Sequence, residues 1–154
     1  MEIALNPEAK RKTSVAVSMK DGEREFGSDA MKVCVKSPKH CYHYLLDLLG
    51  KKIDHPAVAA YKARFPQYQL EADPERGTVL FRHDSETLYS VEELVGMILA
   101  HAKTQAEDYT GQAVRDVVIT THLILSNNHL RKLSSPSGEG SGQTQIKTIE
   151  VDHH

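Results

Sequence analysis

Four residues between positions 34 and 43 carry the side chains that most often bind transition metals. They are Cys34, His40, Cys41 and His43, and thiolate sulfur with imidazole nitrogen is the donor set of zinc sites. The apolar pattern around them predicts a helix over 39–49, on which His40 and His43 are neighbours while Cys41 points elsewhere. No fourth ligand follows at a suitable spacing. Solvated histidines are therefore the preferred interpretation, and no metal site is predicted.

A short basic run precedes two hydroxyl side chains near the start of the chain. Lys10, Arg11 and Lys12 are followed by Thr13 and Ser14, which suits either a basic patch or a kinase-recognised site. Three positive charges in a chain of net charge −2 attract nucleic acid only weakly. A solvated loop is favoured, and no nucleic-acid partner is predicted.

Two pairs of adjacent carboxylates are the remaining candidates for chemistry. Glu92-Glu93 and Glu107-Asp108 lie within one predicted helix, where capping and solubility account for them. The sequence contains no Gly-rich phosphate loop, nucleophile elbow or Walker motif. No catalytic residue is predicted.

Length and composition indicate one ordinary domain with its own core. The chain has 154 residues, and a chain of this size buries roughly 70% of its unfolded surface. Two free thiols are favoured over a single bridge between Cys34 and Cys41. No apolar run reaches the ~20 residues of a membrane span, and Glu2 and Asn6 interrupt the apolar stretch at the N-terminus. Membrane insertion is not expected, and the chain as written is expected in the cytosol.

The elements that must position these residues begin with two strands. Residues 2–5 and 15–19 are rich in apolar and β-branched side chains, with turn signals at Asn6-Pro7 and Asp21-Gly22. The segments predicted next are helices over 27–35, 39–49 and 57–64 and an antiparallel meander over 68–72, 78–82 and 87–89.

The strongest local signal is a long helix followed by a strand. Ser90-Val-Glu-Glu93 is a capping box, apolar residues continue at helical spacing to Tyr109, and Gly111 ends the helix. Residues 114–120 are then rich in Val and Ile, which is typical of a strand inside a sheet. Residues 126–154 are rich in Ser, Gly, Asn and Gln, a composition that predicts a disordered tail.

Several further segments occur in a fixed order. They are Met1-Glu-Ile-Ala-Leu-Asn6, Arg11-Lys12-Thr13-Ser14-Val15, Arg24-Glu-Phe-Gly27 with Ala30, Ser37-Pro38, Leu48-Leu49-Gly50-Lys51, Ser90-Val-Glu-Glu93 and Asp116-Val-Val-Ile-Thr120. In that order they resemble the early part of the ATPase domain of the heat-shock protein 70 chaperone family, over about four-fifths of the chain. Ala63-Arg-Phe-Pro66 and Gln105-Ala-Glu-Asp108 are most similar to its large endoplasmic-reticulum branch, the hypoxia up-regulated type.

This resemblance implies an α+β fold. It is a partial actin-like ATPase (ribonuclease H-like) fold, a first-lobe fragment with an inserted helix-and-meander subdomain over about 21–111. The resemblance makes residues 1–120 a partial nucleotide-binding domain and 121–154 a divergent, disordered tail. It implies ATP and Mg²⁺ as ligands, with Arg11 and Thr13 near the nucleotide. It also implies unfolded secretory proteins and co-chaperones as partners, in the endoplasmic-reticulum lumen.

One departure from the family pattern bears on activity. The family's phosphate-facing lysine, four residues before Gly50, is here Leu46, and Asp47 stands where an arginine is usual. A lysine places positive charge on the transferring phosphoryl group, which a leucine cannot do. In the family one phosphate loop precedes the segment that starts at Met1, and another follows the one that ends at Thr120.

The chain is therefore expected to be a fragment of an ATP-dependent protein-folding chaperone that is not catalytically competent alone. The alternatives are a non-catalytic interaction module for nucleotide-exchange or co-chaperone partners and a truncated product without function. Because the strand at 114–120 would lack one neighbour, its exposed edge predicts self-association.

Overall fold

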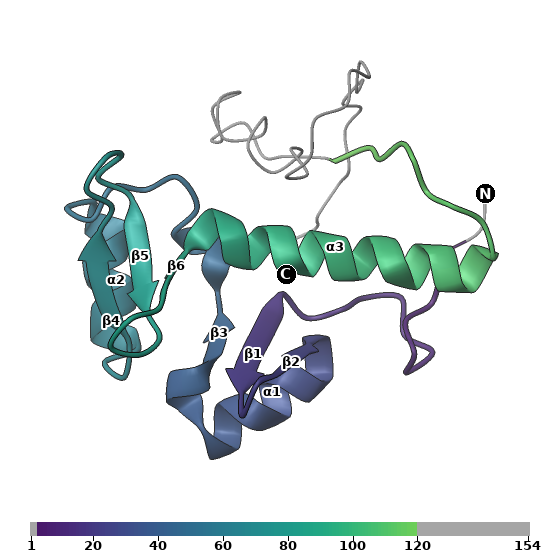
Figure 1. The fold of residues 1–154 in the computed structure, drawn as a ribbon, viewed down its shortest axis with the longest axis horizontal. Coiled ribbons are helices and arrows are strands. Elements are labelled where there is room, and N and C mark those ends of the chain that lie inside the picture. Colours follow the sequence, from purple (N-terminus) through teal and green to yellow (C-terminus); the bar gives the residue numbers. More distant parts are fainter. Residues whose placement is uncertain (1–2, 120–154) are drawn as a thin grey trace.

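The computed structural model describes residues 3–119, which form two small antiparallel sheets joined by one long helix. Figure 1 shows the long helix α3 (Val91–Thr110), with the second sheet and α2 gathered at its N-terminal end and the first sheet and α1 beneath its middle. Within the described range, no helix is long and apolar enough to cross a membrane.

The first sheet contains β1 (Ala16–Lys20), β2 (Glu23–Phe26) and β3 (Cys41–His43) in the order β2-β1-β3. Asp21 and Gly22 join β1 to β2 with φ values of 54° and 81°. Two positive φ values in a two-residue loop are what a tight hairpin needs, and Asp-Gly supplies them readily. The predicted strand at 15–19 and its turn are thus confirmed.

Both faces of β1 are covered. Val17 and Met19 belong to the main core, while the alternate residues Ala16 and Ser18 are buried on the opposite face. Helix α1 (Gly27–Lys36) packs along β1, and its Ala30 is fully buried. The helix predicted over 27–35 is therefore confirmed.

The helix predicted over 39–49 is wrong. Those residues form β3, flanked by the 3₁₀ helices η1 (Pro38–His40) and η2 (Leu45–Asp47). Tyr44 adopts a left-handed conformation with φ 54°, which no α-helix tolerates. Pairing of β3 with β1 places Tyr42 opposite Val17 in the core, so tertiary pairing overrides the local helical period.

The preference for two free thiols is also wrong. Cys34 on α1 and Cys41 on β3 form a disulfide across a Cα–Cα distance of 5.0 Å. Because η1 turns the chain sharply between them, α1 folds back onto β3 and brings the two sulfurs together.

The second sheet confirms the predicted meander. Strands β4 (Gln69–Ala72), β5 (Val79–Arg82) and β6 (Leu88–Ser90) pair in chain order. The Asp73 carboxylate accepts hydrogen bonds from the backbone N–H groups of Glu75 and Arg76 at 2.9 and 3.1 Å, which stabilises the β4–β5 turn. Helix α2 (Pro56–Arg64) precedes this sheet. It begins at a proline, the residue that the sequence analysis placed at the start of this helix.

Helix α3 begins and ends where the sequence predicts. The Ser90 hydroxyl accepts a hydrogen bond from the Glu93 N–H at 3.1 Å, and the Glu93 carboxylate accepts one from the Ser90 N–H at 2.7 Å. This reciprocal pair is the capping box. At the other end Gly111 adopts the left-handed conformation, with φ 66°.

Within residues 3–119, two of the predicted strands are not formed. Residues 3–5 have no regular structure, and neither do residues 114–119 apart from a single bridge at Val118. Val117 and Val118 are 47% and 41% exposed, so neither has the covered position expected of a strand inside a sheet. β-branched composition favours a strand only where a neighbour pairs with it. The predicted disordered tail at 126–154 lies outside the described residues.

Candidate functional site

The side chain of Asn6 organises the loop that carries Arg11 and Thr13. Its Oδ1 accepts hydrogen bonds from the N–H groups of Glu8 and Lys10, at 3.1 and 2.8 Å. Its Nδ2 donates to the Lys12 carbonyl at 3.2 Å and to the Thr13 hydroxyl at 3.4 Å. One amide thereby holds both ends of the loop, as an Asn does in turns. Arg11 and Thr13 are both exposed on it, so the expectation of a loop is met.

Thr13 packs closely against the start of α1. A Cβ atom built on Gly27 would lie 2.8 Å from the Thr13 methyl carbon Cγ2, and Gly27 has φ +59°. The loop of Asn6 to Thr13 can therefore approach α1 only because position 27 lacks a side chain.

Replacing Gly27 with alanine is expected to lower the free energy of unfolding by about 1–3 kcal/mol. A left-handed φ costs an L-residue roughly 1–2 kcal/mol, and the new methyl group would also collide with Thr13. Urea denaturation of Gly27→Ala, Thr13→Ser and the double variant separates the cost of the left-handed backbone from the cost of the collision with Thr13. Thr13→Ser removes the Cγ2 atom, so alanine at position 27 should cost less in that background. Equal costs in both backgrounds would show that the Thr13 contact carries no energy.

Leu46, the residue that the resemblance places where a phosphate-facing lysine is expected, lies on η2 beside the core. Leu45 is fully buried, whereas Leu46 is half-buried against the core cluster and Asp47 is exposed. The position thus carries an apolar side chain partly engaged in packing and no positive charge. Such a side chain cannot stabilise a phosphoryl group electrostatically.

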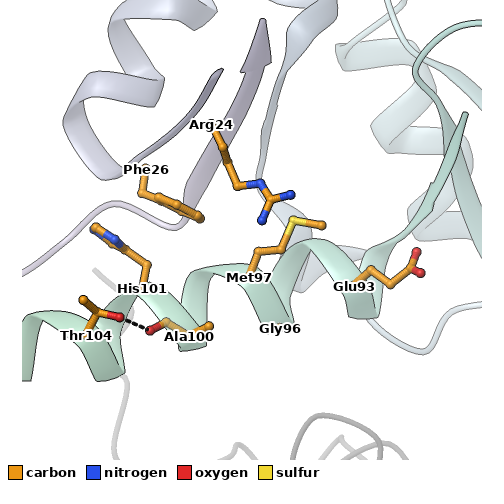
Figure 2. A pocket seen from close by; sticks show the side chains of 8 residues that line it. All are labelled: Arg24, Phe26, Glu93, Gly96, Met97, Ala100, His101 and Thr104. Carbon is orange, nitrogen blue, oxygen red and sulfur yellow. Dashed lines mark hydrogen bonds between the residues drawn. The ribbon is translucent and has the colours of Figure 1, made fainter. Parts of the chain in front are cut away.

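An open groove of about 500 Å³ lies between β2 and α3. Figure 2 shows Phe26 and His101 facing one another at one end of it, with Arg24 reaching toward Met97 and Glu93 further along. The rings of Phe26 and His101 are stacked, with centroids 4.4 Å apart and an interplanar angle of 10°. Burial lowers the pKa of His101 below its usual range, which favours the neutral form of the ring.

Sequence reasoning did not identify this groove. Its residues come from two segments about seventy positions apart, and only the packing of α3 on the first sheet brings them together. A periodic apolar face on α3 was visible, but Met97 and His101 lie beside that face and carry no motif of their own.

Among the paired carboxylates, Glu93 has the capping role that the sequence suggested, whereas Glu92 is buried and is not the solvated side chain expected. Glu93 completes the capping box, and the Glu107 carboxylate accepts a hydrogen bond from the Val114 N–H at 2.9 Å. Glu92 is only 8% exposed and lies 3.9 Å from the Arg76 guanidinium, which compensates part of its burial.

The histidines singled out by the sequence are separated by the fold. His40 ends η1 and its ring lies against that of His83, with centroids 5.5 Å apart. His43 lies on β3, where its Nδ1 is 3.0 Å from the Tyr68 hydroxyl. They do not share a helix face as predicted, because the helix is absent.

Comparison with known proteins identifies the relationship. The family model described as Hsp70 protein matches residues 1–124. This chain belongs to the Hsp70 family. Residues 3–119, which include Arg11, Thr13 and Leu46, all lie within the matched segment of the Hsp70-family chain.

Its relatives include proteins named Hypoxia up-regulated protein 1. The protein from Xenopus tropicalis is 52% identical over 120 residues, which are 78% of this chain and 19% of that protein. The protein from Homo sapiens is 44% identical over 131 residues, which are 85% of this chain and 13% of that protein. The Hsp70-family chain thus spans about a fifth or less of the length of these relatives. The resemblance inferred from short segments is confirmed.

Proposed function

We propose that this chain is part of the ATPase domain of an ATP-dependent protein-folding chaperone of the endoplasmic-reticulum Hsp70 type. Membership in the Hsp70 family over residues 1–124 carries the proposal. Residues 1–120 would be a partial nucleotide-binding domain with an actin-like fold, and 121–154 a divergent tail. The nucleotide would be ATP with Mg²⁺, and Arg11 and Thr13 on the Asn6-organised loop would lie near it. Unfolded secretory proteins and co-chaperones would be the partners of the whole chaperone.

We further propose that the chain alone does not hydrolyse ATP. Leu46 supports this, because a half-buried leucine replaces the charge that family resemblance assigns to that position. The purified chain is expected to show no Mg²⁺-dependent phosphate release above a buffer control. Turnover that Leu45→Ala abolishes, by unfolding the chain, would contradict the proposal.

A chimera tests the family function itself. Residues 1–124 of this chain would replace the matched segment of the Xenopus tropicalis relative, and MgATP binding would be measured by calorimetry. If the segment is a working part of the ATPase domain, the dissociation constant of the chimera for MgATP should lie within about tenfold of that of the parent protein. This corresponds to a difference of about 1.4 kcal/mol in binding free energy. A folded chimera that binds no ATP would refute the proposal.

Leu46→Lys in the same chimera isolates the missing charge. We expect the rate of ATP hydrolysis to rise by about tenfold while the ATP affinity is unchanged. This rise is less than the 10²–10³ that one preorganised donor is worth. Leu46→Met is the matched control, because it keeps the apolar packing and adds no charge.

The second candidate function is that of a non-catalytic interaction module, and the groove between β2 and α3 is the observation that favours it. A chain of this kind would bind a nucleotide-exchange or co-chaperone partner without binding ATP. Two measurements separate the two functions. MgATP binding by the chimera is required only by the first function, and binding of a partner protein by the chain alone is required only by the second.

We also propose that the chain self-associates through residues near Val117 and Val118, which are half-exposed and not part of a sheet within residues 3–119. Sedimentation of wild-type chain and Val118→Lys would show it. The lysine variant is expected to remain monomeric at concentrations where the wild type associates.

A further inference from the structure

The register of β3 brings three metal-binding side chains to one face of the first sheet. Cys41 and His43 alternate with Tyr42 along the strand and lie opposite Ser18 and Ala16 of β1, so both lie on the face of the strand opposite to Tyr42. Helix α1 packs on the first sheet and contributes Cys34 to the same place. The two sulfur atoms and one ring nitrogen of His43 all lie within 4.8 Å of one another.

The hydrogen bonds around His43 specify which ring nitrogen has a free lone pair. The hydroxyl of Tyr68 has one proton and donates it to the Cys41 carbonyl. The same hydroxyl is 3.0 Å from His43 Nδ1, so Nδ1 must donate and Nε2 must carry the lone pair. A metal-binding histidine commonly donates its second ring N–H to an oxygen in this manner.

The backbone that carries these donors is fixed from the core side. Tyr61, only 4% exposed, donates its hydroxyl proton to the His43 carbonyl at 2.8 Å. Tyr68, only 8% exposed, donates to the Cys41 carbonyl. Two buried tyrosines from outside the first sheet thus hold both ends of β3, which gives the three donors a preorganised support.

We propose that Cys34, Cys41 and His43 bind a zinc ion when the disulfide is reduced, so that the disulfide and the zinc complex are two redox states of one site. Two thiolates and one imidazole are suitable zinc ligands, with bonds of about 2.3 and 2.0–2.1 Å. A water molecule would occupy the fourth tetrahedral position. Donors already within 4.8 Å of one another need only side-chain adjustments to reach these bond lengths.

A dithiol is the reductant that converts the disulfide into the zinc complex. The dithiol gives two electrons and two protons to the disulfide, breaks the bond between Cys34 and Cys41, and forms a disulfide between its own sulfurs. Zn²⁺ then replaces the two thiol protons, which pass to solvent. Cys34 is half-buried and Cys41 fully buried, so the attacking thiolate reaches the sulfur of Cys34. The freed Cys41 thiol has an acceptor in the Ala30 carbonyl, 3.3 Å away.

Cobalt binding to the full chain tests the proposal. The chain is reduced with a dithiol, freed of it by gel filtration under nitrogen, and titrated with Co²⁺ and then Zn²⁺. We expect one Co²⁺ per chain with a thiolate-to-cobalt charge-transfer band and a tetrahedral spectrum, both abolished by one equivalent of Zn²⁺. The oxidised chain should show neither. Absence of the charge-transfer band in the reduced chain would overturn the proposal, and so would an octahedral spectrum from histidines elsewhere.

Variants distinguish the three-ligand site from simpler chelation. Cys34→Ser, at a half-buried position, should abolish the charge-transfer spectrum of a tetrahedral bis-thiolate site. His43→Gln should weaken Zn²⁺ binding at least about tenfold in competition with a chromophoric chelator. His40→Gln is the matched control, because His40 is three residues away and outside the site. Equal affinities for wild type and His43→Gln, with circular dichroism confirming the fold, would show a dithiol chelate without His43 and refute the site as proposed.

Discussion

Replacing Phe81 with alanine is expected to lower the free energy of unfolding by about 3–5 kcal/mol. Phe81 on β5 is fully buried. Its ring meets those of Tyr42, Tyr68 and Tyr61 edge to face, with centroids 5.2, 5.4 and 6.1 Å away. Alanine removes the whole ring and leaves a cavity that these tyrosines cannot fill, because their hydroxyl groups are engaged elsewhere.

Urea denaturation followed by circular dichroism measures this loss, with Leu88→Ala as the matched control. Leu88 lies on the neighbouring strand β6 and is 38% exposed, so its truncation should cost less than about 1 kcal/mol. If Phe81→Ala cost no more than Leu88→Ala, the aromatic cluster would not be the centre of the core.

Replacing Leu94 with alanine is expected to cost about 2–5 kcal/mol. Leu94 is fully buried in the first turns of α3. This helix contacts β1 of the first sheet and both β5 and β6 of the second. Removing the side chain therefore weakens the attachment of both sheets at once, and unfolding should remain a single transition at a lower urea concentration.

Gly96→Ala, two residues further along α3, is the control of opposite sign. An added Cβ at Gly96 meets no atom within 4 Å, and alanine is favoured over glycine inside a helix by about 0.8–1.0 kcal/mol. The variant should raise the urea midpoint while Leu94→Ala lowers it. A loss of stability in both would mean that the groove face of α3 is more tightly packed than the structure shows.

The two states of the Cys34–Cys41 pair connect local chemistry to the placement of α1. The disulfide ties α1 to β3 covalently, and in the reduced chain a bound zinc ion would preserve the same connection. Since α1 also starts at Gly27 against Thr13, its position fixes the loop that carries Arg11. Reduction without zinc should therefore loosen the proposed nucleotide-facing loop as well.

Much of the fold follows from short-range signals in the sequence. Asp21-Gly22 specifies a hairpin because both residues tolerate positive φ. The Ser90 and Glu93 pair specifies the start of α3 because the two groups satisfy each other across three residues. The meander and the start of α2 follow from alternation and from Pro56 in the same way. Each of these depends on residues only a few positions apart.

The candidate site was only partly visible in the sequence. The loop of Arg11 and Thr13 could be predicted from it, together with membership in the Hsp70 family. The packing of this loop against Gly27 could not be predicted, because Thr13 and Gly27 are fourteen positions apart and meet only once β1 and β2 have paired.

Residues 39–49 show why tertiary structure decided the rest. Their apolar side chains suit a helical period, but β1 has an open edge, and the hydrogen bonds and core contacts of pairing with it outweigh one short helix. The same pairing puts Cys41 and His43 on one face, beneath Cys34, where a helix would have separated them.

Residues 114–119 show the converse. Their composition favours a strand, but within residues 3–119 no sheet accepts them. The sequence by itself determined the family and the local turns, caps and long helix. The tertiary structure alone decided which segments pair, because pairing energy depends on partners distant in the chain.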